Sequence, residues 1–206
     1  MRNPAPMLLF ACLIILSAAK AQKNENIGST NVFKATILNP GIGYEHSIGK
    51  TQTIAVQAFM NFSAVFYEDV YGERVKTDVY FDPAFTAQYR YYYNFKKRAD
   101  DGKRTEMNSG NYVAAVYEGI FSKAPLKNDF VEEADRRLFS RIGAVWGLQR
   151  NFMKRLSLDV NVGLGYMTAK STKYEPFGNV YKTGSEGFVT ILGQFNIGFW
   201  LNNPRK

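Results

Sequence analysis

The sequence predicts an all-β protein, an eight-stranded antiparallel up-and-down transmembrane β-barrel. Residues 81–94 read FDPAFTAQYRYYYN, and their alternate positions separate an apolar, tyrosine-rich face from a polar face that carries Asp82 and Arg90. The 206-residue chain holds 13 tyrosines and 16 phenylalanines. After residue 21 it has no apolar run of about 18 residues, the length needed for a membrane helix. We therefore expect strands with lipid on one side and a polar interior on the other.

The N-terminus has the pattern of a secretory signal peptide. Arg2 precedes an apolar run at residues 7–19, and Ala19-Lys20-Ala21 forms a small-residue cleavage site. We predict a signal peptide at residues 1–21 and one barrel domain at residues 22–206. The only cysteine, Cys12, lies inside the apolar run in the wrong order for lipidation, so disulfide and thiol chemistry are not expected in the mature chain.

The alternation predicts four strands in the first half of the chain. Residues 32–37 alternate Phe, Ala and Ile with Lys and Thr, and the Asn39-Pro40 turn signal ends them. Residues 41–48 alternate Ile, Tyr, His and Ile with Gly, Glu and Ser. Residues 53–66 place apolar side chains on one face and Gln, Asn and Ser on the other. The strand at residues 81–94 follows. If residues 32–48 were one continuous strand, the count would be seven and the termini would lie at opposite ends.

The second half of the chain supplies four more strands. Residues 111–122 alternate less regularly, with Glu118 on the polar face. Residues 138–150 set Leu, Ile, Ala and Trp against Arg, Gly and Gln. Residues 156–168 alternate Leu, Val and Tyr with Ser, Asp, Asn and Gly. Residues 187–201 close the chain with Val, Ile and Phe against Thr, Gln and Asn.

Connection lengths predict the orientation, because the outer loops of outer-membrane barrels are longer than the periplasmic turns. With the N-terminus in the periplasm, the outer connections are residues 38–40, 67–79, 123–137 and 171–185. The periplasmic connections are residues 49–52, 95–110 and 151–155. The short first loop and the long basic segment 95–110 depart from this rule.

Aromatic residues are expected at both membrane interfaces. The predicted periplasmic girdle consists of Tyr44, Tyr89, Tyr91, Tyr93, Phe199 and Trp200. The outer band consists of Phe66, Tyr67, Phe81, Phe121, Phe139 and Phe188.

Seven charged residues are predicted to face the interior. They are Lys34, Glu45, Asp82, Arg90, Glu118, Arg141 and Asp159. An eight-stranded barrel is just wide enough for side chains to fill it, and buried charges must be paired. We therefore expect an internal salt-bridge network that plugs the barrel; the alternative is a narrow ion path lined by the same groups.

No catalytic, cofactor or metal site is expected, and we predict that the protein is not an enzyme. His46 is the only histidine, and Ser47 beside it points to the opposite face of the strand, so the two cannot form a catalytic pair. The mature chain has no cysteine ligands for a metal. The formal charge of +8 falls to +6 when the signal is removed. Because the chain is exported, the basic turns are expected to meet solvent, anionic headgroups or polyanions rather than nucleic acid.

The chain resembles the small eight-stranded outer-membrane barrels of the outer membrane protein β-barrel domain type, such as the transmembrane domain of outer membrane protein A. The resemblance rests on the signal peptide, Gly43-Tyr44-Glu45 before a short turn, residues 91–94 before a basic turn, and the aromatic last strand. It implies a location in the outer membrane. The implied partners are outer-membrane lipid, lipopolysaccharide and, during biogenesis, the barrel-insertion machinery.

Four functions are compatible with the sequence. The leading expectation is a structural or surface-interaction role in which the outer loops bind an unknown surface ligand. A narrow channel for small solutes or ions is the first alternative. A soluble lipocalin-like barrel with its apolar face inward is the second. A lipid hydrolase that uses His46 is the third.

Overall fold

In a computed structural model of the protein, the described residues are 28–68, 75–124, 136–152, 155–175 and 180–202. The predicted signal peptide, residues 1–21, lies outside this part of the chain. The elements in chain order are β1 (Val32–Thr36), β2 (Gly41–Gly49), β3 (Gln52–Glu68), β4 (Val75–Tyr92), α2 (Phe95–Asp100), η2 (Glu106–Asn108), β5 (Asn111–Ser122), β6 (Arg137–Phe152), β7 (Leu156–Glu175) and β8 (Val180–Trp200).

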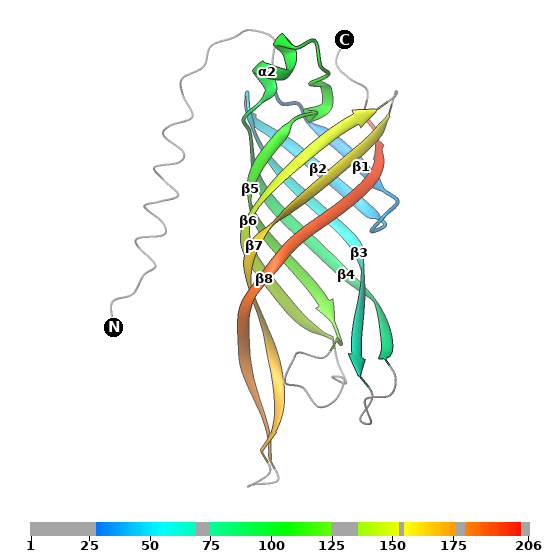
Figure 1. The fold of residues 1–206 in the computed structure, drawn as a ribbon, viewed down its shortest axis with the longest axis vertical. Helices are drawn as coiled ribbons and strands as arrows, with labels where there is room; N and C mark the ends of the chain where they lie inside the picture. Colours follow the sequence, from blue (N-terminus) through cyan, green and yellow to red (C-terminus); the bar gives the residue numbers. More distant parts are fainter. Residues whose placement is uncertain (1–27, 69–74, 125–135, 153–154, 176–179, 203–206) are drawn as a thin grey trace, which may run out of the picture.

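The strands form one closed antiparallel barrel (Figure 1). Each strand pairs with the next along the chain, and β1 closes the ring by pairing residues 34–36 with residues 198–200 of β8. The predicted all-β, up-and-down fold and the count of eight strands are confirmed. The Asn39-Pro40 turn does separate β1 from β2. Asn39 has a φ of 53°, and the Thr36 hydroxyl donates a hydrogen bond of 2.8 Å to its carbonyl. Asparagine adopts this left-handed conformation more readily than most residues.

Two of the predicted outer loops are largely strand. Residues 67–79 were expected to form a loop, but β3 and β4 stay paired as far as Glu68 and Val75. The segment at residues 171–185 is likewise mostly a ladder that ends at Glu175 and Val180. A hairpin ladder pairs backbone N–H and C=O groups locally, whereas a loop would leave them to solvent. Both hairpins project from the end of the barrel opposite α2 (Figure 1).

Side chains alternate between the interior and the outer surface, as the sequence predicts. The outer face carries large apolar residues, such as Ile191 at 70% exposed and Leu164 at 64%. The interior holds charged residues, such as Arg90 at 5% exposed and Glu45 at 2%. A lipocalin-like arrangement needs the apolar face inside, so the observed orientation contradicts that alternative.

The interior is not polar throughout. Charged and amide side chains lie near α2 beside buried tyrosines and aliphatic residues, whereas an apolar cluster without charged members crosses the barrel nearer the long hairpins. Its members are Phe59, Ala84, Ile120, Phe139, Met167 and Ala169. Along β4, Ala84 of this cluster lies between Arg90 and Asp82, so the apolar cluster separates these two charged residues. The interior of the barrel is therefore not uniformly polar.

The predicted basic turn at residues 95–110 folds into a cap over one end of the barrel. It contains α2 and η2, and neither is long and apolar enough to cross a membrane; the same holds for every described helix. Phe95 stacks on Tyr92 with ring centroids 4.6 Å apart. Met107 packs against Val32 and Trp200 and is 3% exposed. The cap therefore closes the interior at this end with apolar side chains.

Hydrogen bonds hold the tip of the cap in a backbone conformation that few residues adopt. Met107 and Asn108 have φ values of 51° and 63°. The Asn108 side chain accepts a hydrogen bond from the Thr30 N–H at 2.8 Å and donates to the Thr30 carbonyl at 2.9 Å. The amides of Gln149 and Asn151 donate to the Met107 carbonyl at 2.9 and 2.7 Å. These contacts fix the cap to the barrel wall and to the segment that precedes β1.

Two aromatic residues that were expected in the interfacial girdles are buried inside the barrel. Trp200 is 4% exposed and packs against the cap, so its assignment to the outward periplasmic girdle is wrong. Phe199 points outward, and successive residues of a strand must face opposite sides. For the same reason Phe139, between outward Leu138 and Ser140, belongs to the buried apolar cluster rather than to the outer band. The side chains of Phe66 and Tyr67 lie outside the described part of the chain.

Candidate functional site

The interior site is organised around Arg90 of β4. Its Nη1 lies 2.8 Å from Asp159 Oδ2 and 3.7 Å from Glu45 Oε2. The same nitrogen donates to Gln149 Oε1 at 3.0 Å, and Nε donates to Gln88 Oε1 at 2.8 Å. A buried guanidinium is tolerated when its donors are bonded and its charge is paired; here Nε and Nη1 are bonded and the charge is paired with carboxylates.

Lys34 of β1 supplies a second cation to the same cluster. Its Nζ lies 3.4 Å from Glu45 Oε2 and 3.8 Å from Asp159 Oδ2, and it donates to Gln149 Oε1 at 2.6 Å. Two cations therefore face two carboxylates inside the barrel, and the cluster has no net charge. This side chain also links β1, whose backbone pairs with β8 over only three residues, to β6 and β7 across the interior.

Hydroxyl groups complete the bonding of both carboxylates. Glu45 Oε1 accepts hydrogen bonds from Thr53 at 2.8 Å and from Tyr92 at 2.7 Å. Asp159 Oδ1 accepts one from Tyr112 at 2.7 Å, and the Arg90 guanidinium lies 4.4 Å from the centre of the Tyr112 ring. The result is a network in which each carboxylate oxygen has a partner.

The network draws on all eight strands. Besides the residues above, Gln88 of β4 donates to Gln194 of β8 at 3.2 Å. Sequence reasoning missed Gln149, Tyr92 and Tyr112, because it collected charged residues only. The alternation of side chains could have identified the two tyrosines as inward residues, because Tyr112 shares its face with Ala114 and Glu118, and Tyr92 shares its face with Arg90.

The other predicted interior charges do not join this network. Glu118 pairs with Arg141 directly across β5 and β6, with Oε1 and Nη1 3.0 Å apart. Asp82 is buried beyond the apolar cluster, and its Oδ1 lies 3.8 Å from Nε of Arg136, a half-exposed residue that the sequence analysis did not select. Of the seven predicted residues, the structure thus brings four together, pairs two separately and leaves Asp82 at a distance.

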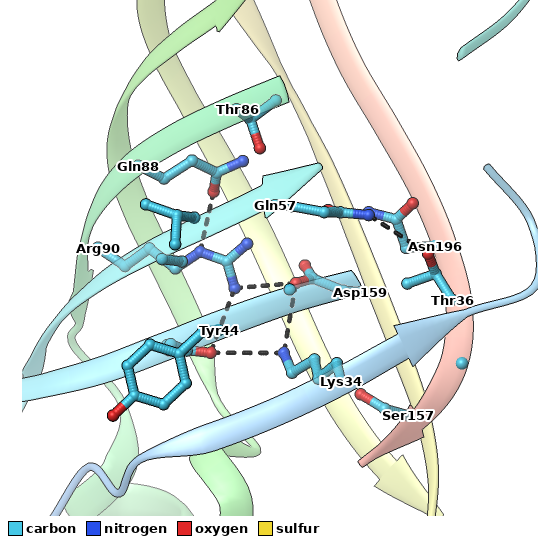
Figure 2. A pocket seen from close by; sticks show the side chains of 15 residues that line it. Lys34, Thr36, Tyr44, Gln57, Thr86, Gln88, Arg90, Ser157, Asp159 and Asn196 are labelled. Atoms are coloured by element: carbon cyan, nitrogen blue, oxygen red, sulfur yellow. Dashed lines mark hydrogen bonds and ion pairs between the residues drawn. The ribbon is translucent and has the colours of Figure 1, made fainter. Parts of the chain in front are cut away.

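A small cavity borders the network on the side away from the cap. Its volume is about 40 Å³, which is room for a few water molecules. Figure 2 shows Lys34, Arg90 and Asp159 on one side of it and Gln57 and Asn196, which are hydrogen-bonded to each other, on the other. The buried Ser157 hydroxyl also borders the cavity and has no hydrogen-bond partner among the described residues. Polar groups around so small a space suit water better than an organic substrate.

His46 and Ser47 do not form a catalytic pair. His46 is exposed on the outer face, where its ring stacks on Tyr44 with centroids 6.2 Å apart. Ser47 faces the other side, and its hydroxyl lies 2.6 Å from the Ser29 hydroxyl. This geometry agrees with the alternation argument.

Aromatic side chains gather on the outer face near the cap. Tyr44, Tyr91, Tyr93 and Phe199 are exposed there, as the sequence predicts, and Tyr89 is half-buried among them. The structure adds Trp146 of β6, whose indole N–H donates to the Tyr93 hydroxyl at 2.7 Å. The sequence analysis placed Trp146 on the outward face of its strand and did not include it in the girdle.

The chain matches a family model over most of its length. Residues 7–199 match the family model described as "Protein of unknown function (DUF3575)". The chain belongs to the DUF3575 family. No protein of curated function and no solved structure matched it. The sequence analysis expected the outer membrane protein β-barrel domain family, and the family model that matches is DUF3575. The eight-stranded barrel expected from that resemblance is present.

Proposed function

We propose that this DUF3575 protein is an integral outer-membrane β-barrel with a structural or surface-interaction role. The observation that carries the proposal is the distribution of side chains, which is the inverse of that in a soluble barrel. Large apolar residues cover the outer face, while Arg90, Asp159 and Glu45 are buried inside. Soluble monomers rarely expose contiguous apolar patches beyond a few hundred Å², whereas each large apolar side chain that enters lipid gains up to about 2 kcal/mol.

The height of the apolar belt fits a bilayer. On β4, Phe81 near the hairpin end and Tyr91 near the cap are ten residues apart, and both point outward. At about 3.4 Å per residue and a tilt of roughly 40°, they are separated by about 26 Å along the barrel axis, close to the ~25 Å apolar band of outer-membrane barrels. Phe81 packs edge-on against Phe62, with centroids 5.2 Å apart. Aromatic residues therefore border the belt at both ends.

The proposed orientation places the cap in the periplasm and the two long hairpins outside. An N-terminal signal-peptide pattern supports export, and the resemblance to small outer-membrane barrels supports this orientation. Outer-membrane lipid and lipopolysaccharide would surround the belt, and the barrel-insertion machinery would act during biogenesis. The β3–β4 and β7–β8 hairpins would make the surface contacts, because recognition is commonly carried by segments that project from a rigid scaffold. No catalytic activity is proposed.

The interior supports a plugged barrel over a channel. Three groups of side chains follow one another along the interior. They are the cap residue Met107, the charge network, and the apolar cluster around Phe59 and Phe139. An eight-stranded barrel leaves little lumen once side chains fill it. We therefore expect planar-bilayer recordings to show no conductance steps. A reproducible conductance that Arg90→Ala alters would favour the channel instead.

The membrane proposal is tested by comparing two arginine substitutions. Leu164 is 64% exposed on the outward face of β7, within the belt, and Thr77 is exposed on the projecting part of β4. We expect wild type and Thr77→Arg to fractionate with outer membranes and to shift in gel mobility on boiling. Leu164→Arg should reduce both, because an arginine at the bilayer midplane of such a barrel costs about 2–4 kcal/mol.

A soluble barrel would behave in the opposite way. Replacing an exposed leucine with arginine would then leave folding intact or improve solubility. Recovery of the wild-type protein in the soluble periplasmic fraction, with Leu164→Arg as well folded as Thr77→Arg, would overturn the proposal.

A further inference from the structure

Two arginines lie together at the rim of the barrel, beside the outward aromatic residues near the cap. Arg150 is on β6 and shares the outward face with Trp146 and Phe152, both of which are exposed. Arg98 is in α2 of the cap, and its backbone N–H donates to the Asn94 carbonyl at 3.0 Å. The Asn94 side chain accepts a hydrogen bond at 2.7 Å from the N–H of Asn111, the residue that binds the Arg150 guanidinium, so α2 begins beside Arg150 and the charge of Arg98 acts on it. The rim therefore presents two guanidinium groups where the apolar belt ends.

The local hydrogen bonds fix this arrangement. The Arg98 guanidinium donates to the Arg104 carbonyl at 3.2 and 2.9 Å, which ties α2 to the rest of the cap. Arg150 donates to the side-chain carbonyl of Asn111 and to the Gln149 carbonyl at 2.8 Å. Asn111 in turn donates to the Tyr93 hydroxyl at 3.4 Å, which joins the arginine site to the Tyr93–Trp146 pair.

Neither arginine forms an ion pair with a carboxylate within the described part of the chain. Their bonded partners are neutral oxygens. Asp101 acts electrostatically on Arg98, but its carboxylate is already hydrogen-bonded to Lys103 at 3.0 Å. Partial burial lowers the pKa of Arg98, and Asp101 opposes that shift. Arginine stays protonated at neutral pH, so two like charges stand close together without a bound counter-charge from the described residues.

We infer that Arg98 and Arg150 bind the phosphate of an anionic phospholipid in the leaflet nearest the cap. The inference rests on the proposed membrane location. Guanidinium groups bind phosphate oxygens in pairs of parallel hydrogen bonds, and one phosphate between the two arginines would relieve their repulsion. The Trp146 and Tyr93 rings lie where the glycerol and first methylenes of that lipid would pass, since such rings occupy the headgroup level. The position on the outward face favours a lipid over an anion in bulk solution.

Trp146 provides the reporter for a direct test. Full-length protein is folded into phosphatidylcholine vesicles that contain a minor fraction of either brominated phosphatidylglycerol or brominated phosphatidylcholine, and bromine quenching of tryptophan fluorescence is measured. The other tryptophan, Trp200, is buried inside the barrel. The fluorescence that remains in the Trp146→Phe variant measures the contribution of Trp200. We expect brominated phosphatidylglycerol to associate more strongly than phosphatidylcholine, by on the order of fivefold for each arginine.

Substitutions with matched charge separate a site from general attraction. Arg98→Gln/Arg150→Gln should abolish the preference, whereas Lys96→Gln/Lys97→Gln, which removes the same charge from exposed positions of the same cap, should keep most of it. Arg150→Lys, which disturbs folding least, should retain part of the preference. A boiling-dependent gel shift verifies that each variant is folded.

The outcomes also distinguish this inference from the proposed function. Equal quenching by the two brominated lipids in wild type, or an equal loss in both double variants, overturns the phosphate site and leaves the membrane barrel standing. Absence of quenching by either lipid overturns both, because the outward face would then not be in the bilayer.

Discussion

Replacing Arg90 with methionine should destabilise the barrel strongly. The substitution keeps much of the side-chain volume and removes the charge at the centre of the interior network. Asp159 would lose its 2.8 Å partner, and Gln88 and Gln149 would lose a donor each. Lys34 Nζ, 3.8 Å from Asp159, compensates only in part. Removing one partner of a buried ion pair costs about 3–5 kcal/mol, because the other charge stays buried without its counter-charge.

A double-mutant cycle shows whether the cost comes from the pair itself. Arg90→Met and Asp159→Asn should each destabilise the protein, while the double variant should cost less than their sum by about 1–3 kcal/mol. Removing both leaves Lys34 and Glu45, at 3.4 Å, as a neutral pair. Urea unfolding in phospholipid vesicles, followed by tryptophan fluorescence, measures the free energy of unfolding for each variant.

The control is Lys103→Met, which breaks an exposed ion pair on the cap. Exposed pairs contribute little, so no measurable change is expected. If Arg90→Met cost no more than Lys103→Met, the network would not stabilise the barrel. Strict additivity in the cycle would show that Arg90 and Asp159 do not interact.

Three further outcomes follow from the cap and the barrel wall. Asn108→Ala should release the cap, because it loses two hydrogen bonds to Thr30 and puts alanine at a φ of 63°. The release is measured as faster proteolysis between residues 95 and 110. Asn108→Gly should destabilise the cap by about 1 kcal/mol less, since glycine adopts that φ freely, and equal effects of the two variants would contradict this reasoning. Gly163→Ala should lower stability by about 1–3 kcal/mol, because its Cβ would clash with the Ala144 carbonyl and stand 2.6 Å from Val145 Cα, whereas Gly184→Ala, with open space around it, should be tolerated. The hydrogen bond from Lys103 lowers the pKa of Asp101, so NMR titration should find it below the ordinary aspartate value and Lys103→Met should raise it. Any stabilisation from this pair is present above the unfolded-state pKa and disappears as the pH falls through the folded-state pKa.

The sequence by itself determined the strand set and the face of nearly every described side chain. Alternation is a local property, because each peptide unit turns the next side chain to the other side. It therefore placed Leu164 outside and Asp159 inside without knowledge of neighbouring strands. The same rule would have placed Trp200 and Phe139 inside, had parity been followed at these aromatic residues rather than their affinity for interfaces. The extended hairpins were missed because their polar residues also suit loops.

Only the tertiary structure decided which inward residues meet. Glu118 and Arg141 face each other on adjacent strands, but Arg90 of β4 finds Asp159 on β7, three strands away. The height of each residue in a barrel depends on the stagger of all the strands together, and no single strand encodes that stagger. The same stagger leaves Asp82 beyond the apolar cluster, while the hydrogen bonds of Asn94 place α2 beside Asn111 and Arg150. Alternation thus fixes the direction of a side chain, while closure of the barrel fixes its neighbours.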